Sequence, residues 1–87
     1  MIKGTTASGF TFEIDENKVN DMRVIDAMVE TEEGNIGGIS KLISLIFDKA
    51  QKKALYTFCA DENGRVDIEE CSKVVFEILS FNGETKN

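Results

Sequence analysis

The N-terminal part of the chain alternates between apolar and polar positions, which is typical of a β-strand with one buried face. Phe10, Phe12 and Ile14 are the apolar members of this strand. Ser8-Gly9 supplies a turn before it, and residues 2–6 would pair with it as the other strand of a hairpin. Because an isolated two-stranded hairpin is marginal in water, we expect its aromatic face to lie on helices.

After this hairpin the apolar spacing changes to that of an α-helix. Asn20 or Asp21 can cap the first helix, which is expected to end at Gly34. The apolar residues that fall on one face of it are Met22, Ile25, Met28 and Val29. Gly37-Gly38 is expected to form a flexible junction after this helix.

The next two helices follow directly. The most regular amphipathic stripe of the chain comprises Ile39, Leu42, Ile43, Ile46 and Phe47. Asp48 would cap the helix after it. The residues of that helix predicted to face inward are Ala54, Leu55, Phe58 and Cys59.

A polar loop at residues 61–64 precedes the last helix, which Asp67 would begin with Glu70 as its capping-box partner. The buried stripe predicted for this helix is Ile68, Cys71, Val74, Val75, Ile78 and Leu79. Phe81-Asn82-Gly83 is expected to close it, leaving residues 84–87 as a flexible tail.

Together these elements predict a mainly helical α+β fold, in which an N-terminal β-hairpin packs on about four short helices. The chain has 87 residues, which is enough for one domain, and we place that domain at residues 1–83.

The composition excludes several functional classes. A chain without His cannot carry a His-based acid–base catalyst or a His-containing zinc site. The 2 Cys are too few for a disulfide scaffold, so Cys59 and Cys71 are interpreted as small core residues. The carboxylates of Glu13, Asp15 and Glu16 are interpreted as solvated charges. We therefore expect no enzymatic activity and no cofactor.

The charge pattern bears on the partners. The formal net charge is −6, whereas nucleic-acid-binding proteins present a basic stripe. The lysines that cluster in the middle of the chain, better explained as a solvated helix face, are Lys41, Lys49, Lys52 and Lys53. No apolar run is long enough to cross a membrane, and the first residues lack the apolar core of a signal peptide. We expect a soluble cytoplasmic protein with neither a nucleic-acid nor a membrane partner.

One segment resembles a calcium-binding loop of the EF-hand type, with Gly64 at the sharp turn. Its potential ligands are Asp61, Asn63, the carbonyl of Arg65, Asp67 and Glu70. Cys59 occupies the first ligand position, where a thiol suits a hard cation poorly. The same residues are explained without a metal, as a turn, an N-cap and its capping partner. We expect no metal site and keep a weak single-loop calcium-binding module as the alternative.

Three apolar residues lie off the predicted helix stripes: Leu45, Phe76 and Phe81. A single exposed apolar residue is unremarkable in a soluble protein. If these residues converge, they would mark a surface for a partner or for self-association.

Several short segments spread over nearly the whole chain carry a family resemblance. They are Ser8-Gly9-Phe10, Phe12-Glu13-Ile14-Asp15, Asn20-Asp21-Met22, Gln51-Lys52-Lys53-Ala54-Leu55-Tyr56, Asp61-Glu62-Asn63-Gly64-Arg65-Val66 and the final Lys86-Asn87. In this order and spacing, the chain resembles the small tail assembly chaperones of siphovirus-type phages and prophages of Gram-positive bacteria.

The resemblance implies a non-catalytic chaperone of phage tail assembly that acts in the host bacterial cytoplasm and is absent from the mature virion. Its implied partner is the tape-measure protein, a very long helical chain whose apolar segments it keeps soluble. The major tail protein, which forms the tail tube around the tape measure, is a further implied partner. Our hypothesis is that Leu45, Phe76 and Phe81 contribute the binding surface.

Overall fold

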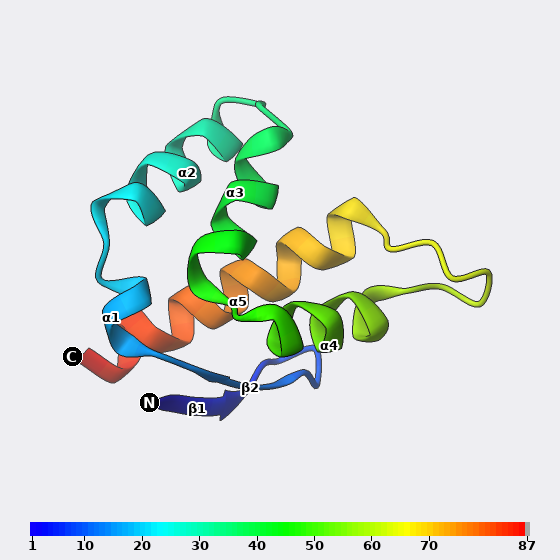
Figure 1. Ribbon diagram of the computed structural model, residues 1–87, viewed down its shortest axis with the longest axis horizontal. Helices are drawn as coiled ribbons and strands as arrows, with labels where there is room; N and C mark the ends of the chain where they lie inside the picture. Colours follow the sequence, from blue (N-terminus) through cyan, green and yellow to red (C-terminus); the bar gives the residue numbers. More distant parts are fainter. Residues whose placement is uncertain (87) are drawn as a thin grey trace.

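The computed structural model describes the backbone of residues 1–86 and the side chains of residues 1–80 (Figure 1). Within these residues two antiparallel strands are followed by five helices, which confirms the predicted fold class. The elements are β1 (Ile2–Thr5), β2 (Thr11–Ile14), α1 (Glu16–Val19), α2 (Met22–Glu32), α3 (Gly37–Ile46), α4 (Lys49–Cys59) and α5 (Ile68–Lys86).

The hairpin forms as predicted, with Ile2 of β1 opposite Ile14 of β2. Gly9 takes a φ of 98° in the turn, a conformation that favours glycine. The turn is also held from inside, because the buried Thr6 hydroxyl accepts a hydrogen bond of 3.1 Å from the backbone N–H of Phe10. This arrangement directs the aromatic side chains of Phe10 and Phe12 onto the helices.

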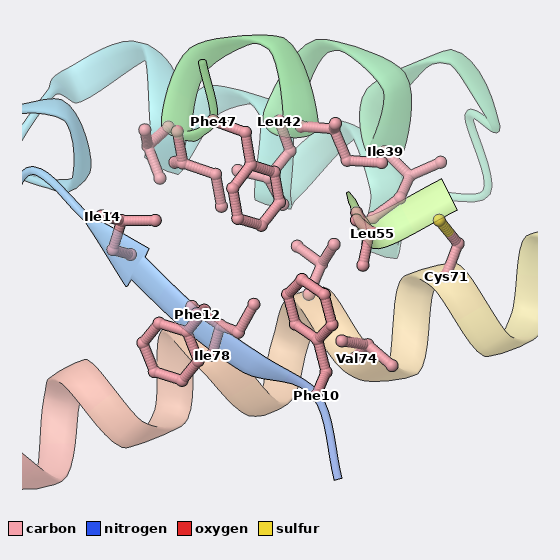
Figure 2. Packing of buried hydrophobic residues seen from close by; sticks show 14 of the residues in the cluster. Phe10, Phe12, Ile14, Ile39, Leu42, Phe47, Leu55, Cys71, Val74 and Ile78 are labelled. Atoms are coloured by element: carbon pink, nitrogen blue, oxygen red, sulfur yellow. The ribbon is translucent and has the colours of Figure 1, made fainter. Parts of the chain in front are cut away.

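The core lies between the hairpin, α3, α4 and α5. Figure 2 shows side chains of α3 and α5 pointing toward one another, with Phe10 between them. All five residues of the predicted α3 stripe are buried, which confirms that stripe. The fully buried members of the core include Phe12, Leu42, Leu55 and Ile78.

The stripes of α4 and α5 are only partly as predicted. Leu55 and Cys59 are buried, but Ala54 and Phe58 are exposed, so the inward assignment of these two residues was wrong. Each directly precedes a buried residue and is rotated by about 100° from it, toward solvent. In α5 the stripe is buried from Cys71 to Ile78, whereas Ile68 in the first turn is exposed.

Three local features differ from the prediction. Helix α1 was not predicted, because its single turn, which is capped by the Asp15 carboxylate, is too short to show a helical period. Gly37-Gly38 is no flexible junction, because both residues belong to the first turn of α3 and Gly38 is buried. Helix α5 continues past residues 81–83 to Lys86, since a helix can accommodate one glycine at a cost of about 1 kcal/mol.

Helices α2 and α3 lie side by side and form a helical hairpin on the rest of the domain (Figure 1). The sequence predicts that the first of these helices ends at Gly34. Helix α2 ends at Glu32, and Gly34 takes a φ of 91° in the turn that follows it. Within the described part of the chain, no helix has the length and apolar character needed to span a membrane.

Candidate partner-binding surface

The most exposed apolar surface on a regular element lies on α2. Met22, Ile25 and Val29 are spaced as one helix face and are 66%, 52% and 46% exposed. The sequence placed these three residues and Met28 on one face. Met28 is partly buried against the core, whereas the other three are turned to solvent. The residues that α2 buries are Val24 and Ala27. Helix α2 therefore carries two apolar faces, of which only one is used by the fold. The name "α2 stripe" is used below for Met22, Ile25 and Val29.

The close approach of α3 explains which face of α2 packs. Gly38 lets the backbones of the two helices come close together, and a larger side chain at that position would collide with α2. Only small residues fit on the facing side of α2, where Ala27 is buried and the Thr31 hydroxyl donates a hydrogen bond of 2.8 Å to the Ala27 carbonyl. Met22, Ile25 and Val29 lie on the opposite, outer face, whereas Met28 lies between the two faces and is partly buried against the core.

The α2 stripe is flanked by negative charge. Asp26, Glu32 and Glu33 are exposed, and none of them forms an ion pair within the described side chains. Glu30, on the side toward α3, is paired with Lys41 at 3.1 Å. The stripe thus combines an apolar centre with an acidic rim.

The start of α2 is held by its cap. The Asp21 carboxylate accepts a 2.9 Å hydrogen bond from the backbone N–H of Arg23 and forms a 2.7 Å ion pair with its guanidinium. These side-chain and backbone hydrogen bonds lower the pKa of Asp21 from 3.8 to about 2. Of the two predicted cap residues, Asn20 and Asp21, the structure selects Asp21.

Two of the three residues predicted as a partner site, Leu45 and Phe76, line different depressions. Leu45 is partly buried in a depression of about 530 Å³ between α2 and α3. Phe76 is partly buried in another, of about 450 Å³, beside the N-terminal hairpin. The two depressions have no lining residue in common, and the side chain of Phe81 lies outside the described residues. An apolar residue that misses the main stripe of its helix can still contact the core at the edge of that stripe.

A second exposed apolar face lies on α4. A shallow depression of about 520 Å³ is lined by Phe10, Ala50, Lys53, Ala54, Thr57 and Phe58. The ring of Phe58 lies 5.3 Å from the ring of the buried Phe10 and is itself 42% exposed. We call Ala50, Ala54, Thr57 and Phe58 the α4 face.

The calcium-like loop extends away from the body of the domain (Figure 1, yellow). Its Asp61 carboxylate accepts hydrogen bonds from the backbone N–H groups of Arg65 and Asn63, at 3.0 and 2.9 Å, which lower its pKa. Asp67 accepts from the N–H of Glu70 at 3.0 Å, and the Arg65 side chain lies 3.3 Å from both Asp61 and Asp67. The carboxylates thus contact protein donors, and the described residues contain no cluster suited to holding a metal.

The two cysteines are core residues. Both thiols are free and buried. Burial, and then the neighbouring Cys71, raise the pKa of Cys59 to about 12, and burial also raises the pKa of Cys71. Neither thiol is poised to act as a nucleophile, because the reactive form is the thiolate.

No protein-family model matches this chain, and neither a curated protein nor a solved structure shows significant similarity to it.

Proposed function

We propose that this protein is a tail assembly chaperone that binds the tape-measure protein in the host cytoplasm and does not remain in the mature virion. The observation that carries the proposal is the α2 stripe: three large apolar side chains exposed on one face of a helix that already has a separate packing face. Such a stripe is not needed by the fold. An exposed apolar stripe of this kind is typical of a surface that binds another protein. The family resemblance suggests which protein that partner is.

The chemistry of the α2 stripe suits an amphipathic helix. A partner helix can lay its own apolar side chains against residues spaced by three and four positions, as in helix-in-groove recognition. Each apolar side chain that becomes fully buried contributes roughly 1.5–3 kcal/mol, part of which offsets the entropy of association. The acidic rim keeps the free chaperone soluble and favours partner helices with basic flanks. Binding of this kind is reversible, as a chaperone that departs after assembly requires.

The proposal is tested by co-expression with the tape-measure protein of the same phage or prophage, followed by separation of soluble and pelleted protein. The chaperone should raise the soluble fraction of the tape-measure protein. Ile25→Gln combined with Val29→Gln should abolish this effect, because it removes the apolar stripe while keeping good helix formers and the flanking charges.

Ile68→Gln is the matched control. Ile68 is 54% exposed, close to the 52% of Ile25, but it stands at the start of α5 rather than on α2. This variant should solubilise the tape-measure protein as well as the unmodified chain does. Equal solubilisation by the double variant would show that the α2 stripe is not the binding surface, and no solubilisation by any variant would reject the proposed function.

A further inference from the structure

The two cysteines meet where α4 ends and α5 begins. Cys59 is the last residue of α4, and Cys71 stands at the end of the first turn of α5. Helix α4 presents the α4 face to solvent and turns Leu55 and Cys59 inward. Figure 2 shows the Cys71 side chain pointing from α5 toward α4, beside Leu55. The two thiols are hydrogen-bond partners, so their sulfur atoms are adjacent.

The backbone fixes the position of this pair. The carbonyl of Cys59 accepts a hydrogen bond of 3.5 Å from the N–H of Asp67, and the carbonyl of Asp67 accepts one of 3.0 Å from the N–H of Cys71. Next to Cys59, Ala60 pairs with Val66 as an isolated antiparallel bridge. The polar loop that separates the two cysteines in the sequence is thus closed at its base, and the cysteines lie at that base.

We propose that Cys59 and Cys71 form a redox-sensitive pair, which carries two thiols in a reducing medium and closes to an intramolecular disulfide in an oxidising one. The co-reactant is a small-molecule disulfide, of which glutathione disulfide is the example used below. Both cysteines belong to one chain and one core, so the disulfide forms within the molecule rather than between two copies.

The reaction is a thiol–disulfide exchange in two steps. The sulfur of one cysteine, after losing its proton to solvent, attacks a sulfur of glutathione disulfide. The S–S bond of that molecule breaks, one glutathione leaves, and a mixed disulfide remains on the protein. The sulfur of the other cysteine then loses its proton, attacks the protein-side sulfur of the mixed disulfide and releases the second glutathione. The protein gives up two electrons and two protons, which the two glutathione molecules take up.

Burial controls when this reaction can occur. The side chains of Cys59 and Cys71 are only 6% and 5% exposed, so a molecule as large as glutathione disulfide does not reach either sulfur in the closed domain. Burial also raises the pKa of both thiols, which keeps them protonated and unreactive. The exchange therefore requires the segment between the end of α4 and the start of α5 to open.

The disulfide would in turn prevent that opening. The base of the loop is held in the reduced chain by backbone hydrogen bonds and by the Asp67 cap. A covalent bond between Cys59 and Cys71 closes the same base permanently and also reduces the freedom of the unfolded chain. A reducing cytoplasm would leave the segment free to open, whereas oxidising surroundings would lock α4 to α5.

The experiment is a redox titration of the purified full-length chain in mixtures of reduced glutathione and glutathione disulfide. After the reaction is stopped with acid, free thiols are counted under denaturing conditions and the intact mass is recorded. The oxidised protein should have lost both of its free thiols, its mass should be lower by about 2 Da, and it should carry no glutathione. The equilibrium constant of oxidation should be about tenfold or more larger for the folded protein than in concentrated urea, because the fold holds the two sulfurs together.

The rate of oxidation tests whether opening of the segment limits the reaction. Oxidation of the folded chain should be slow at neutral pH and faster in urea concentrations below the unfolding transition, where the segment opens more often. Asp61→Ala removes a carboxylate that accepts two backbone hydrogen bonds in the loop, so it should raise the rate severalfold. Glu62→Ala, the matched control, should leave the rate unchanged.

The single variants Cys59→Ala and Cys71→Ala are the controls for the product. Each keeps one thiol, so each should gain a glutathione or link two chains. The proposal would be overturned by glutathione attached to the unmodified chain in place of the internal disulfide, or by an equilibrium constant no larger in the folded protein than in urea. A urea midpoint that is lower for the oxidised chain than for the reduced chain would overturn it equally. These three measurements use the unmodified chain, so they hold even where a cysteine variant does not fold.

This inference does not depend on the tape-measure protein. The α2 stripe contributes no residue to the cysteine pair, so failure of the redox titration would leave the proposed function unaffected.

Discussion

Gly38 lies directly against Thr31: a Cβ atom at Gly38 would stand 2.5 Å from the Thr31 Oγ1 and 2.8 Å from its backbone nitrogen. The Thr31 hydroxyl is bound to the Ala27 carbonyl and the nitrogen belongs to the helix, so neither can move aside easily. We expect Gly38→Ala to lower the free energy of unfolding by about 1–3 kcal/mol, although alanine favours helices more than glycine does. Urea unfolding followed by circular dichroism measures this change.

The neighbouring glycine supplies the control for that prediction. A Cβ at Gly37 would meet only the Asn35 Oδ1, at 3.2 Å. This oxygen accepts a hydrogen bond from the Gly37 N–H, a contact that the non-glycine residues Asn17 and Arg23 make equally with the aspartates two positions before them. Gly37→Ala should therefore leave stability unchanged or raise it. If both substitutions had the same effect, the close α2–α3 packing described above would be wrong.

A second prediction separates the α2 stripe from the core. Replacing exposed Ile25 or Val29 by Gln should change the free energy of unfolding by no more than about 0.5 kcal/mol, because neither residue packs inside the domain. Leu55→Ala, at a position with 0% exposure, should cost about 2–5 kcal/mol. Thermal and urea unfolding of the three variants test this contrast, and a loss of several kcal/mol at Ile25 would contradict the exposed placement of the stripe.

The buried thiols predict a pH dependence. The folded protein holds the proton of Cys59 up to about pH 12, whereas the unfolded chain releases it near its ordinary pKa of 9.0. Above that pH the native state binds more protons than the unfolded state, so the free energy of unfolding should fall as pH rises beyond 9 and be unaffected at neutral pH. Urea unfolding at neutral and alkaline pH measures the slope.

The control for this slope is the double variant Cys59→Ala, Cys71→Ala. Its stability at neutral pH should be lower, because two core side chains are shortened, but its alkaline slope should be shallower than that of the unmodified chain. A slope identical in both proteins would assign the pH dependence to other groups.

The loop between α4 and α5 carries a further prediction. Asp61→Ala should destabilise the loop, because its carboxylate accepts hydrogen bonds from two backbone amides. Glu62→Ala, which leaves both contacts in place, should have little effect. Since these contacts already occupy Asp61, millimolar calcium should produce no saturable change in the backbone amide signals of the loop. Saturable shifts centred on Asp61 and Glu70 would instead support the calcium-binding alternative.

The sequence predicts those parts of the fold that depend on local chemistry. The hairpin turn follows from Gly9, and Asp48 and Asp67 were recognised as caps because a carboxylate before an amphipathic run can accept from the first free N–H groups. The α3 stripe was equally clear, since Ile39, Leu42, Ile43 and Ile46 of that helix and Phe47 directly after it form a single apolar face and are all buried. The resemblance to tail assembly chaperones and the partners that it implies stay predictions.

The hydrophobic period of a helix does not determine which of two apolar faces packs against the rest of the domain. Helix α2 offers one face with Val24 and Ala27 and another with Ile25 and Val29, and the face that packs is decided by Gly38 on a different helix. Looking for a second apolar face on α2 would have indicated the stripe. Leu45 and Phe76, the off-stripe residues selected from the sequence, are partly buried at the edges of the core, and their part in partner binding stays a prediction.

The small number of side chains that α2 buries also has a dynamic consequence. This helix buries only Val24 and Ala27, whereas α3 buries five residues. Its backbone amides should exchange with deuterium through an opening of α2 alone, while the remaining helices stay closed, because local units with few buried contacts open below the global free energy. Whatever covers α2 must close this opening, so slowed exchange confined to α2 would reveal an occupant directly, without any substitution.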